Sequence, residues 1–378
     1  MTLLRYISFF FVACLVSSCA KDDELIPEKP VARTVMVYMA ANNSLAANAY
    51  ANLNQMEEGF QAVDGKLVVY ARIFGQQPKI YEIVHDSSPE IKSKVLKTYG
   101  DHDSSDPEMM KIIFADMKQL AAADSYAAIL WSHATNWAPA NLGRVGLRSF
   151  GDDNYSSMDV QQLKAALATD LDFLIFDACS MASVEVLYEL RQVTPYILAS
   201  PTEVLSVGMP YEQLGSLLFA ADVPTSLARM AEVYVQYYQQ KNGLEQSATF
   251  SLIDTRELDA LAAATKQLLA TYKERIPTFS RSGIQRMDLD PSSPVVAFDF
   301  QDFLDKHFIE AEQQAVTAAI NRAVRYKAHT SNFLGQPINV FSGLSTYIPV
   351  REEEHLRAFY KSLAWSADAG YDNLFWWD

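Results

Sequence analysis

The sequence predicts an α/β fold built on a mostly parallel sheet with helices on both of its faces. Strand-like and helix-like segments alternate over the first two thirds of the chain with short connections, which is typical of βαβ units. The strand-like runs are apolar at nearly every position, as in parallel strands that are buried on both faces. After residue 254, helical patterns dominate, so we expect a mainly helical C-terminal subdomain.

The first elements follow from apolar periodicity and helix signals. Asn42, Asn43 and Ser44 offer N-caps for a helix that Gly59 closes. Asp106, followed by Pro107, has the composition of a second helix start. In chain order we therefore expect a strand at 34–40, a helix to Glu58, strands at 66–73 and 79–84, and a helix from Asp106.

Two apolar strands each end in a residue that can carry chemistry. Residues 126–132 lead into His133, and residues 172–178 lead into Cys179. Right-handed crossovers place the carboxyl ends of parallel strands at one edge, where ligands bind in such sheets. A thiol nucleophile and its base need a Cys and a His in this relation. We therefore expect His133 and Cys179 to lie together at this edge.

The remaining elements place Cys179 directly before a helix. A helix from Met181 to Arg191 would bring its positive end close to the thiol and favour the thiolate. A lone Cys beside an apolar strand is also typical of an inert core residue, so the pattern alone leaves both interpretations open. The other expected elements are a loop at 135–153, helices at 159–167, 226–240, 257–270 and 310–326, and strands at 196–200 and 249–253.

Two stretches resemble the clostripain family of cysteine peptidases. The family has His-Gly-x-Gly-Trp after one apolar strand and Asp-Ala-Cys-x-Met after another. Here residues 133–137 read His-Ala-Thr-Asn-Trp, and residues 177–181 read Asp-Ala-Cys-Ser-Met. Residues 38–43 and 200–203 also resemble the family, and the resemblance covers roughly residues 33–218. It implies a caspase-like three-layer sandwich, which we place at residues 33–254, with residues 255–378 as the C-terminal subdomain.

The resemblance also implies a function for particular residues. It implies an endopeptidase that cleaves after Arg or Lys through a thioacyl-enzyme, with His133 as general base and Cys179 as nucleophile. The backbone N–H groups of Ala134 and Cys179 would bind the oxyanion. Asp177 would be an acid of the specificity pocket, although a hydrogen-bonded Asp at a strand end is an equally good interpretation.

Family members are also cut between the His and Cys strands during maturation. Arg144 and Arg148 lie in that loop, so cleavage after one of them would be self-processing. For either residue alone, a solvated loop arginine is at least as good an interpretation.

Two departures from the family pattern leave a second hypothesis open. Ala134 replaces a Gly, and Gly tolerates backbone conformations that Ala does not. Val207 lies where the family loop often has a second pocket acid, and a single carboxylate should hold a cation less firmly. The alternative is therefore a catalytically degraded member that binds peptides or a partner protein at the same sheet edge.

The first 19 residues resemble a bacterial lipoprotein signal. A positive charge and an apolar run too short to span a bilayer lead to Val16-Ser17-Ser18-Cys19, a lipobox-like sequence. Residues 20–24 resemble the acidic surface-export signal of Bacteroidetes lipoproteins, and residues 20–32 read as a tether. We expect a lipid on Cys19 and an outer-membrane, cell-surface location. An ordinary secretory signal is the alternative.

Charge and cysteine usage limit the other classes of function. A formal net charge of −15 argues against nucleic-acid binding. With Cys14 removed and Cys19 lipidated, Cys179 stands alone and no disulfide framework is formed. We expect a monomer that acts on peptides or proteins, with no structural zinc and no cofactor. The Asp-rich segments 101–103 and 152–153 could bind calcium but lack the alternation of a calcium loop.

Overall fold

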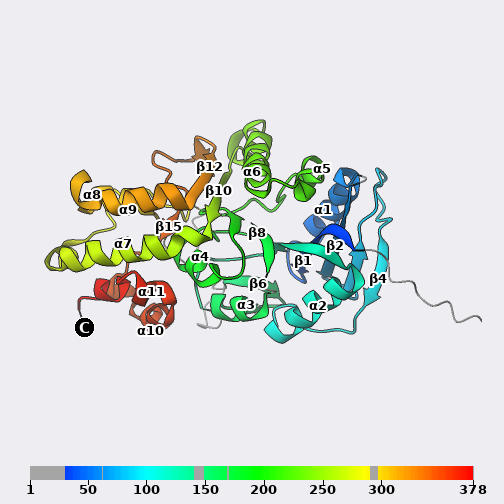
Figure 1. Ribbon diagram of the computed structural model, residues 1–378, viewed down its shortest axis with the longest axis horizontal. Helices are drawn as coiled ribbons and strands as arrows, with labels where there is room; N and C mark the ends of the chain where they lie inside the picture. Colours follow the sequence, from blue (N-terminus) through cyan, green and yellow to red (C-terminus); the bar gives the residue numbers. More distant parts are fainter. Residues whose placement is uncertain (1–29, 62, 140–148, 168–169, 290–296, 378) are drawn as a thin grey trace, which may run out of the picture.

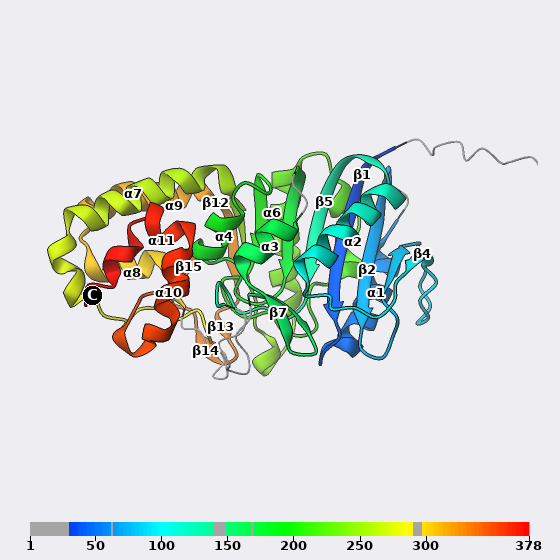
Figure 2. The same cartoon turned by 90° about the horizontal axis from the view of Figure 1, so that it is seen from below.

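The computed structural model describes residues 30–61, 63–139, 149–167, 170–289 and 297–377. In this part of the chain, a nine-stranded sheet lies between two layers of helices, as Figures 1 and 2 show. The predicted α/β architecture is therefore confirmed. One face carries α1 (Ala46–Gly59), α5 (Tyr211–Leu214) and α6 (Val223–Gln239), and the other carries α2 (Pro107–Leu120), α3 (Val160–Ala166) and α4 (Val184–Leu190).

The middle of the sheet is parallel and its two ends are antiparallel. Five neighbouring strands pair in parallel, and two strands at each end of the sheet run antiparallel to their neighbours. The strand order is β12 (Val324–His329), β10 (Thr249–Asp254), β9 (Tyr196–Ala199), β8 (Leu171–Asp177), β5 (Ala123–Trp131), β1 (Val31–Ala41), β2 (Gly65–Ile73), β3 (Lys79–Glu82) and β4 (Lys94–Thr98).

Strand β1 shows why the central strands are apolar throughout. Met36 and Tyr38 point into the core beneath α2 and α3, whereas Val35, Val37 and Met39 point into the core beneath α1 and α6. All five side chains are fully buried. Because successive residues of a strand face opposite sides, a sheet covered on both sides requires apolar residues at every position.

Two predicted helix starts are confirmed by their caps. Asp106 accepts a hydrogen bond from the N–H of Glu108 at 2.9 Å, with Pro107 in the first turn of α2. Asp159 and Gln162 form a reciprocal capping box at α3, with bonds of 2.8 and 2.9 Å. Each cap satisfies amide groups that a helix N-terminus otherwise leaves unpaired.

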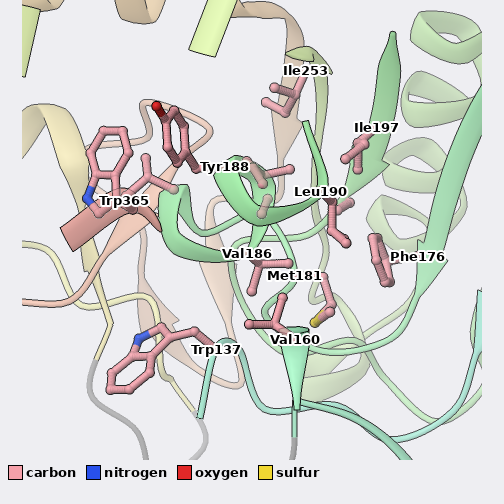
Figure 3. Close-up of a cluster of buried hydrophobic side chains, with 14 of the residues drawn as sticks. Trp137, Val160, Phe176, Met181, Val186, Tyr188, Leu190, Ile197, Ile253 and Trp365 are labelled. Atoms are coloured by element: carbon pink, nitrogen blue, oxygen red, sulfur yellow. The ribbon is translucent and has the colours of Figure 1, made fainter. Parts of the chain in front are cut away.

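The chain after residue 254 is mainly helical, as predicted, and packs against α4. Figure 3 shows the buried cluster at this contact, where the rings of Tyr188 and Trp365 meet edge to face at 5.5 Å. None of the described helices combines the length and the apolar character that crossing a bilayer requires. The elements of this part are α7 (Leu258–Thr271), α8 (Phe300–His307), α9 (Glu310–Ala323), α10 (Glu354–Ser362) and α11 (Ala364–Asp368), with short strands β11 (Phe298–Asp299), β13 (Asn332–Phe333), β14 (Gln336–Pro337) and β15 (Ser345–Thr346).

Two predicted elements differ in the structure. The helix expected to run to Tyr326 ends at Ala323, and the next six residues form β12, antiparallel to β10 at the sheet edge. Their alternation of apolar and polar side chains suits an edge strand with one covered face. The loop expected at 135–153 ends in a strand, β6 (Phe150–Asp153), which pairs with β7 (Ser156–Met158).

Candidate active site

His133 and Cys179 lie at equivalent places at the ends of neighbouring strands. β5 and β8 are parallel, and their last residues, Trp131 and Asp177, are partners in register. His133 and Cys179 each come two residues after these partners. Both residues line a single pocket of about 70 Å³, together with Asp177. The structure therefore brings together the three side chains that the sequence places at this edge.

The thiol of Cys179 contacts the backbone of one residue of the loop after β9. The N–H of Val204 donates to Sγ at 3.3 Å, and Sγ lies 3.6 Å from the carbonyl oxygen of Val204. An N–H donor favours the thiolate, whereas the carbonyl accepts only from the protonated thiol. The Cys179 side chain is half-buried and free of disulfide bonding.

The helix after Cys179 starts later than predicted. It begins at Val184, with the Ser183 hydroxyl as its cap, instead of at Met181. Ser180 has a φ of 61°, and the N–H groups of Ser180 and Ala182 donate to the carbonyls of Thr202 and Ser200. These bonds tie the intervening turn to the end of β9. The predicted helix start at Met181 is therefore wrong, and residues 180–183 separate Cys179 from the first residue of the helix.

His133 is held through both its backbone and its ring. The N–H of Gly151 donates to the carbonyl of His133 at 3.0 Å, and Ala134 forms a bridge with Phe150. Nε2 of the ring lies 3.0 Å from Oγ of Ser44, which follows β1. Strand β6, which the sequence pattern did not reveal, therefore supports the backbone of His133.

The replacement of the family Gly by Ala134 causes no backbone strain. Ala134 is not among the non-glycine residues with positive φ in the described part of the chain. The left-handed conformation falls instead at Asn136, with a φ of 59°. Asn tolerates this region better than most residues. The objection to Ala134 as a donor of a backbone N–H therefore does not hold.

Asp177 is a buried carboxylate whose partners come from the segment between β9 and α5 and from the first residue of α5. Only 5% of its surface is exposed. Oδ2 accepts hydrogen bonds from the N–H of Met209 at 3.0 Å and from the hydroxyl of Tyr211 at 2.8 Å. Burial raises the pKa of Asp177 to about 6, against the opposing effect of these two donors. Above that pH the group is a carboxylate that lines the pocket.

Val207 leaves this pocket without a second acid at its position. The Val207 side chain is 43% exposed, and its carbonyl accepts from Nδ2 of Asn52 at 3.1 Å. Oδ1 of Asn52 accepts in turn from the indole N–H of Trp131 at 2.7 Å. Asn52 is almost fully buried in α1, so it links the loop to β5. The sequence predicted this helix from the signals at its two ends, which do not mark Asn52.

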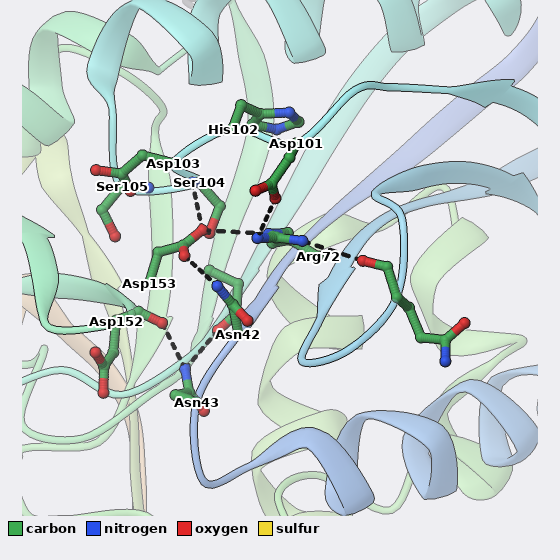
Figure 4. A network of polar contacts seen from close by, with 12 residues as sticks. Asn42, Asn43, Arg72, Asp101, His102, Asp103, Ser104, Ser105, Asp152 and Asp153 are labelled. Atoms are coloured by element: carbon green, nitrogen blue, oxygen red, sulfur yellow. Dashed lines mark hydrogen bonds and ion pairs between the residues drawn. The ribbon is translucent and has the colours of Figure 1, made fainter.

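The Asp-rich segments meet beside the active site around one arginine (Figure 4). Nη2 of Arg72 lies 2.6 Å from Oδ1 of Asp101, and Nε lies 3.5 Å from Oδ2 of Asp153. The same Asp153 oxygen accepts from the N–H and the hydroxyl of Ser104 at 2.7 and 2.8 Å. No cluster of three or more His, Cys, Asp or Glu residues suited to a metal ion exists in the described residues. The guanidinium thus supplies a positive charge among these carboxylates.

Three of the predicted site residues cannot be placed. Arg144, Arg148 and Cys19 lie outside the described residues, as do the predicted signal at 1–19 and most of the tether at 20–32.

The comparisons with known proteins identify the family of this chain. The model of the clostripain family matches residues 37–336. An inactive zymogen of a C11 protease from Parabacteroides distasonis is 30% identical, covers 90% of this chain and 98% of its own, and has a TM-score of 0.77. A secreted C11 cysteine protease from Bacteroides thetaiotaomicron, solved with an irreversible peptide inhibitor, has the same identity and TM-score and covers 90% of this chain and 100% of its own. No curated protein matches. The chain therefore belongs to the clostripain family of cysteine peptidases, which have the caspase-like fold.

Proposed function

We propose that this peptidase works through a Cys179–His133 dyad and cleaves peptide bonds after Arg or Lys. The observation that carries the dyad is the register of β5 and β8, which brings both residues into one pocket. The irreversible peptide inhibitor of the Bacteroides relative supports peptides as the substrate class.

The reaction starts with transfer of the Cys179 thiol proton to His133. The thiolate adds to the carbonyl carbon of the scissile bond, and the negative charge moves to the carbonyl oxygen. Collapse of this intermediate breaks the C–N bond, His133 gives its proton to the leaving amine, and a thioacyl-enzyme is left. His133 then removes a proton from water, which attacks the thioester. The acid product leaves, and the thiol is restored.

Backbone groups stabilise the two charged species. The N–H groups of Ala134 and Cys179 bind the oxyanion, and the unstrained backbone of Ala134 makes this role compatible with a side chain. The N–H of Val204, 3.3 Å from Sγ, favours the thiolate.

Asp177 carries the preference for a basic residue. Its carboxylate is charged above a pKa of about 6 and shares the pocket with the nucleophile. Burial raises the pKa of Tyr211 well above its usual value, so its hydroxyl stays protonated and orients Asp177 as a donor. With Val207 in place of a second acid, the pocket has less negative charge than a two-acid pocket and should discriminate less strongly against neutral residues.

The size of the pocket fits a form that precedes processing. A volume of about 70 Å³ is far below the roughly 300 Å³ or more of typical ligand sites. A long basic side chain therefore requires movement of the lining residues of the loop after β9, which are Val204, Leu205, Ser206 and Gly208. Cleavage after Arg144 or Arg148 would convert this unprocessed form into the active enzyme, as the zymogen state of the Parabacteroides relative suggests. N-terminal sequencing of incubated protein, with Arg144→Ala and Arg148→Ala beside it, identifies the bond.

Export and anchoring complete the proposal. Cys19 would carry the lipid that attaches a monomer to the outer membrane at the cell surface, and the secreted Bacteroides relative supports export. Cys19→Ser should move the protein from the detergent phase to the aqueous phase of a Triton X-114 extract. Retention in the detergent phase would rule out this anchor.

Covalent trapping tests the dyad directly. A peptide chloromethyl ketone that ends in Arg should alkylate the Cys179 sulfur with loss of chloride and so add its mass less HCl to the peptide containing Cys179, and Cys179→Ala should abolish this labelling. His133→Ala should slow labelling strongly. A folded protein that neither reacts nor turns over any peptide would support the alternative, a degraded member that binds peptides or a partner protein. Val207 is the observation that favours that alternative.

A further inference from the structure

We propose that Ser44 is a positioning residue for the His133 ring. This inference rests on the proposed dyad and adds a third side chain to it. Oγ of Ser44 lies 3.0 Å from Nε2 of His133. Ser44 lies just past the end of β1, which pairs in parallel with β5, the strand that carries His133. The contact therefore joins the ends of two neighbouring strands.

The Asn43 side chain holds the backbone on either side of Ser44 in place through three hydrogen bonds. Nδ2 of Asn43 donates to the carbonyls of Ala40 at 3.1 Å and Asp152 at 2.7 Å, as Figure 4 shows for this side chain. Oδ1 of Asn43 accepts from the N–H of Leu45 at 2.9 Å. Ser44 therefore lies in a turn that Asn43 anchors to β1 and to β6.

The helix that follows is not capped by the Ser44 side chain. The prediction that Asn42, Asn43 and Ser44 cap this helix is wrong, because α1 has Leu45 at its N-cap and no side-chain cap. A Ser or Asn cap would stabilise the helix. The helix α1 lacks that stabilisation, and the Ser44 hydroxyl contacts the imidazole of His133 instead.

The contact engages Nε2 and so leaves Nδ1 to serve the thiol in the tautomer that carries its proton on Nε2. A neutral imidazole has one N–H donor and one acceptor nitrogen. When Nε2–H donates to Ser44, Nδ1 keeps the lone pair and takes the proton of Cys179. In the resulting imidazolium both nitrogens are donors, so Ser44 still accepts, and its own hydrogen turns to water because Ser44 is exposed. Ser44 therefore favours the imidazolium–thiolate pair.

Other titratable groups near the pair stay unchanged in the variants that test this role. Asp177 shares the pocket with His133 and Cys179. Asp152 and Asp153 follow Gly151, whose N–H donates to the His133 carbonyl. A shift in the pH dependence of Cys179 reactivity in Ser44→Ala is therefore attributable to the lost hydroxyl.

The test follows the reactivity of Cys179 in the absence of substrate. Iodoacetamide alkylation of the full-length protein is measured from pH 5 to 9 by mass spectrometry of the peptide that contains Cys179. Ser44→Ala should move the midpoint of the rate–pH curve upward and lower the rate near pH 6 by roughly 5- to 20-fold. Ser44→Thr keeps the hydroxyl and should restore the curve. Ser125→Ala is the matched control, because its exposed hydroxyl bonds the Ala32 carbonyl at the opposite edge of the sheet.

His133→Ala separates the two ways in which the proposal can fail. If His133→Ala shifts the curve and Ser44→Ala does not, the dyad stands and the role of Ser44 is wrong. If His133→Ala leaves the curve unchanged, the dyad itself is wrong and the role of Ser44 falls with it. With substrate, Ser44→Ala should lower kcat by a similar factor and leave KM nearly unchanged. A change in KM alone, or no rescue by Ser44→Thr, would contradict positioning.

Discussion

Gly208 and Asp177 are in contact at a point where no side chain fits. A Cβ atom added to Gly208 would lie 2.7 Å from Oδ2 of Asp177, the oxygen that Met209 and Tyr211 already bond. Gly208 also has a φ of +73°, which residues with a Cβ rarely adopt. The loop after β9 can therefore enclose the pocket acid only because this position is glycine.

Gly208→Ala should damage both stability and the preference for basic substrates. Strain and collision together should cost about 2–4 kcal/mol of unfolding free energy. Gly75→Ala is the matched control, because Gly75 has a φ of +76° and nothing within 4 Å of its added Cβ. That variant should cost only about 1 kcal/mol. Equal losses of unfolding free energy in the two variants, measured by urea unfolding, would show that the collision with Asp177 adds nothing to the cost.

Asp177→Asn should remove the preference for basic residues with little effect on the dyad. Asn keeps an oxygen that can accept from Met209 and Tyr211 but has no charge, so the ratio of kcat/KM for an Arg substrate to that for its citrulline analogue should fall by about 100-fold. The citrulline substrate is the internal control for the dyad. An unchanged ratio would assign the preference to other residues.

The same ratio should depend on pH in the wild-type protein. The pKa of Asp177 is raised to about 6 by burial, so its charge is present above pH 6 and is lost as the pH falls through that value. Because titration of the dyad affects both substrates equally, it cancels in the ratio. The ratio should therefore decline below about pH 6, and a flat ratio from pH 5 to 8 would contradict the assignment.

A buried acid on α4 should make stability fall as the pH rises. Oε1 of Glu185 accepts from the N–H of Tyr347, the hydroxyl of Tyr360 and the hydroxyl of Thr346, at 2.9, 2.9 and 3.2 Å. Burial nevertheless raises the pKa of Glu185 from 4.5 to about 7. Between these values the folded protein holds more protons than the unfolded chain, so the stability contribution is present below pH 4.5 and is lost as the pH rises through 7.

Glu185→Gln should flatten this dependence. In the wild type, the Glu185 contribution to the unfolding free energy should decline by about 3 kcal/mol between pH 4.5 and 7.5. The measurement is urea unfolding at several pH values, with Glu58→Gln on the exposed side of α1 as control. Parallel curves for the wild type and Glu185→Gln would show that Glu185 does not titrate in this window.

Chelation should leave turnover unchanged, because the guanidinium of Arg72 already lies among the carboxylates next to the site. Loss of wild-type activity in EDTA, restored by calcium, would contradict this prediction.

Arg72→Leu should lower the unfolding free energy by about 3 kcal/mol, because Asp153, whose surface is only 6% exposed, loses its positively charged partner.

Sequence patterns predicted the parts of the fold that depend on local periodicity. The β5 and β8 strands, their shared edge and the caps at Asp106 and Asp159 follow from short-range rules and are confirmed. The end of α9 was missed because Val324 and Tyr326 continue an apolar pattern compatible with a helix. Only pairing with β10, more than 70 residues earlier in the chain, makes the segment a strand.

The contacts that shape the site depend on tertiary structure and were harder to predict. Ser44 has the composition of a helix cap, and only the neighbouring position of β5 shows that its hydroxyl meets His133. Asn52 is a polar residue on a helix, and only the packing of α1 reveals that it joins Trp131 to the Val207 loop. Residue type alone indicates neither contact.

The measurement that tests the central claim most directly is peptide turnover by the wild type, Cys179→Ala and His133→Ala. Fluorogenic substrates ending in Arg, in Lys and in a small apolar residue are compared at pH 7.5, before and after incubation that allows processing. We expect the wild type to cleave the basic substrates and both variants to lose that activity by at least about 1,000-fold. Cleavage of basic substrates that survives Cys179→Ala or His133→Ala would contradict the proposed dyad.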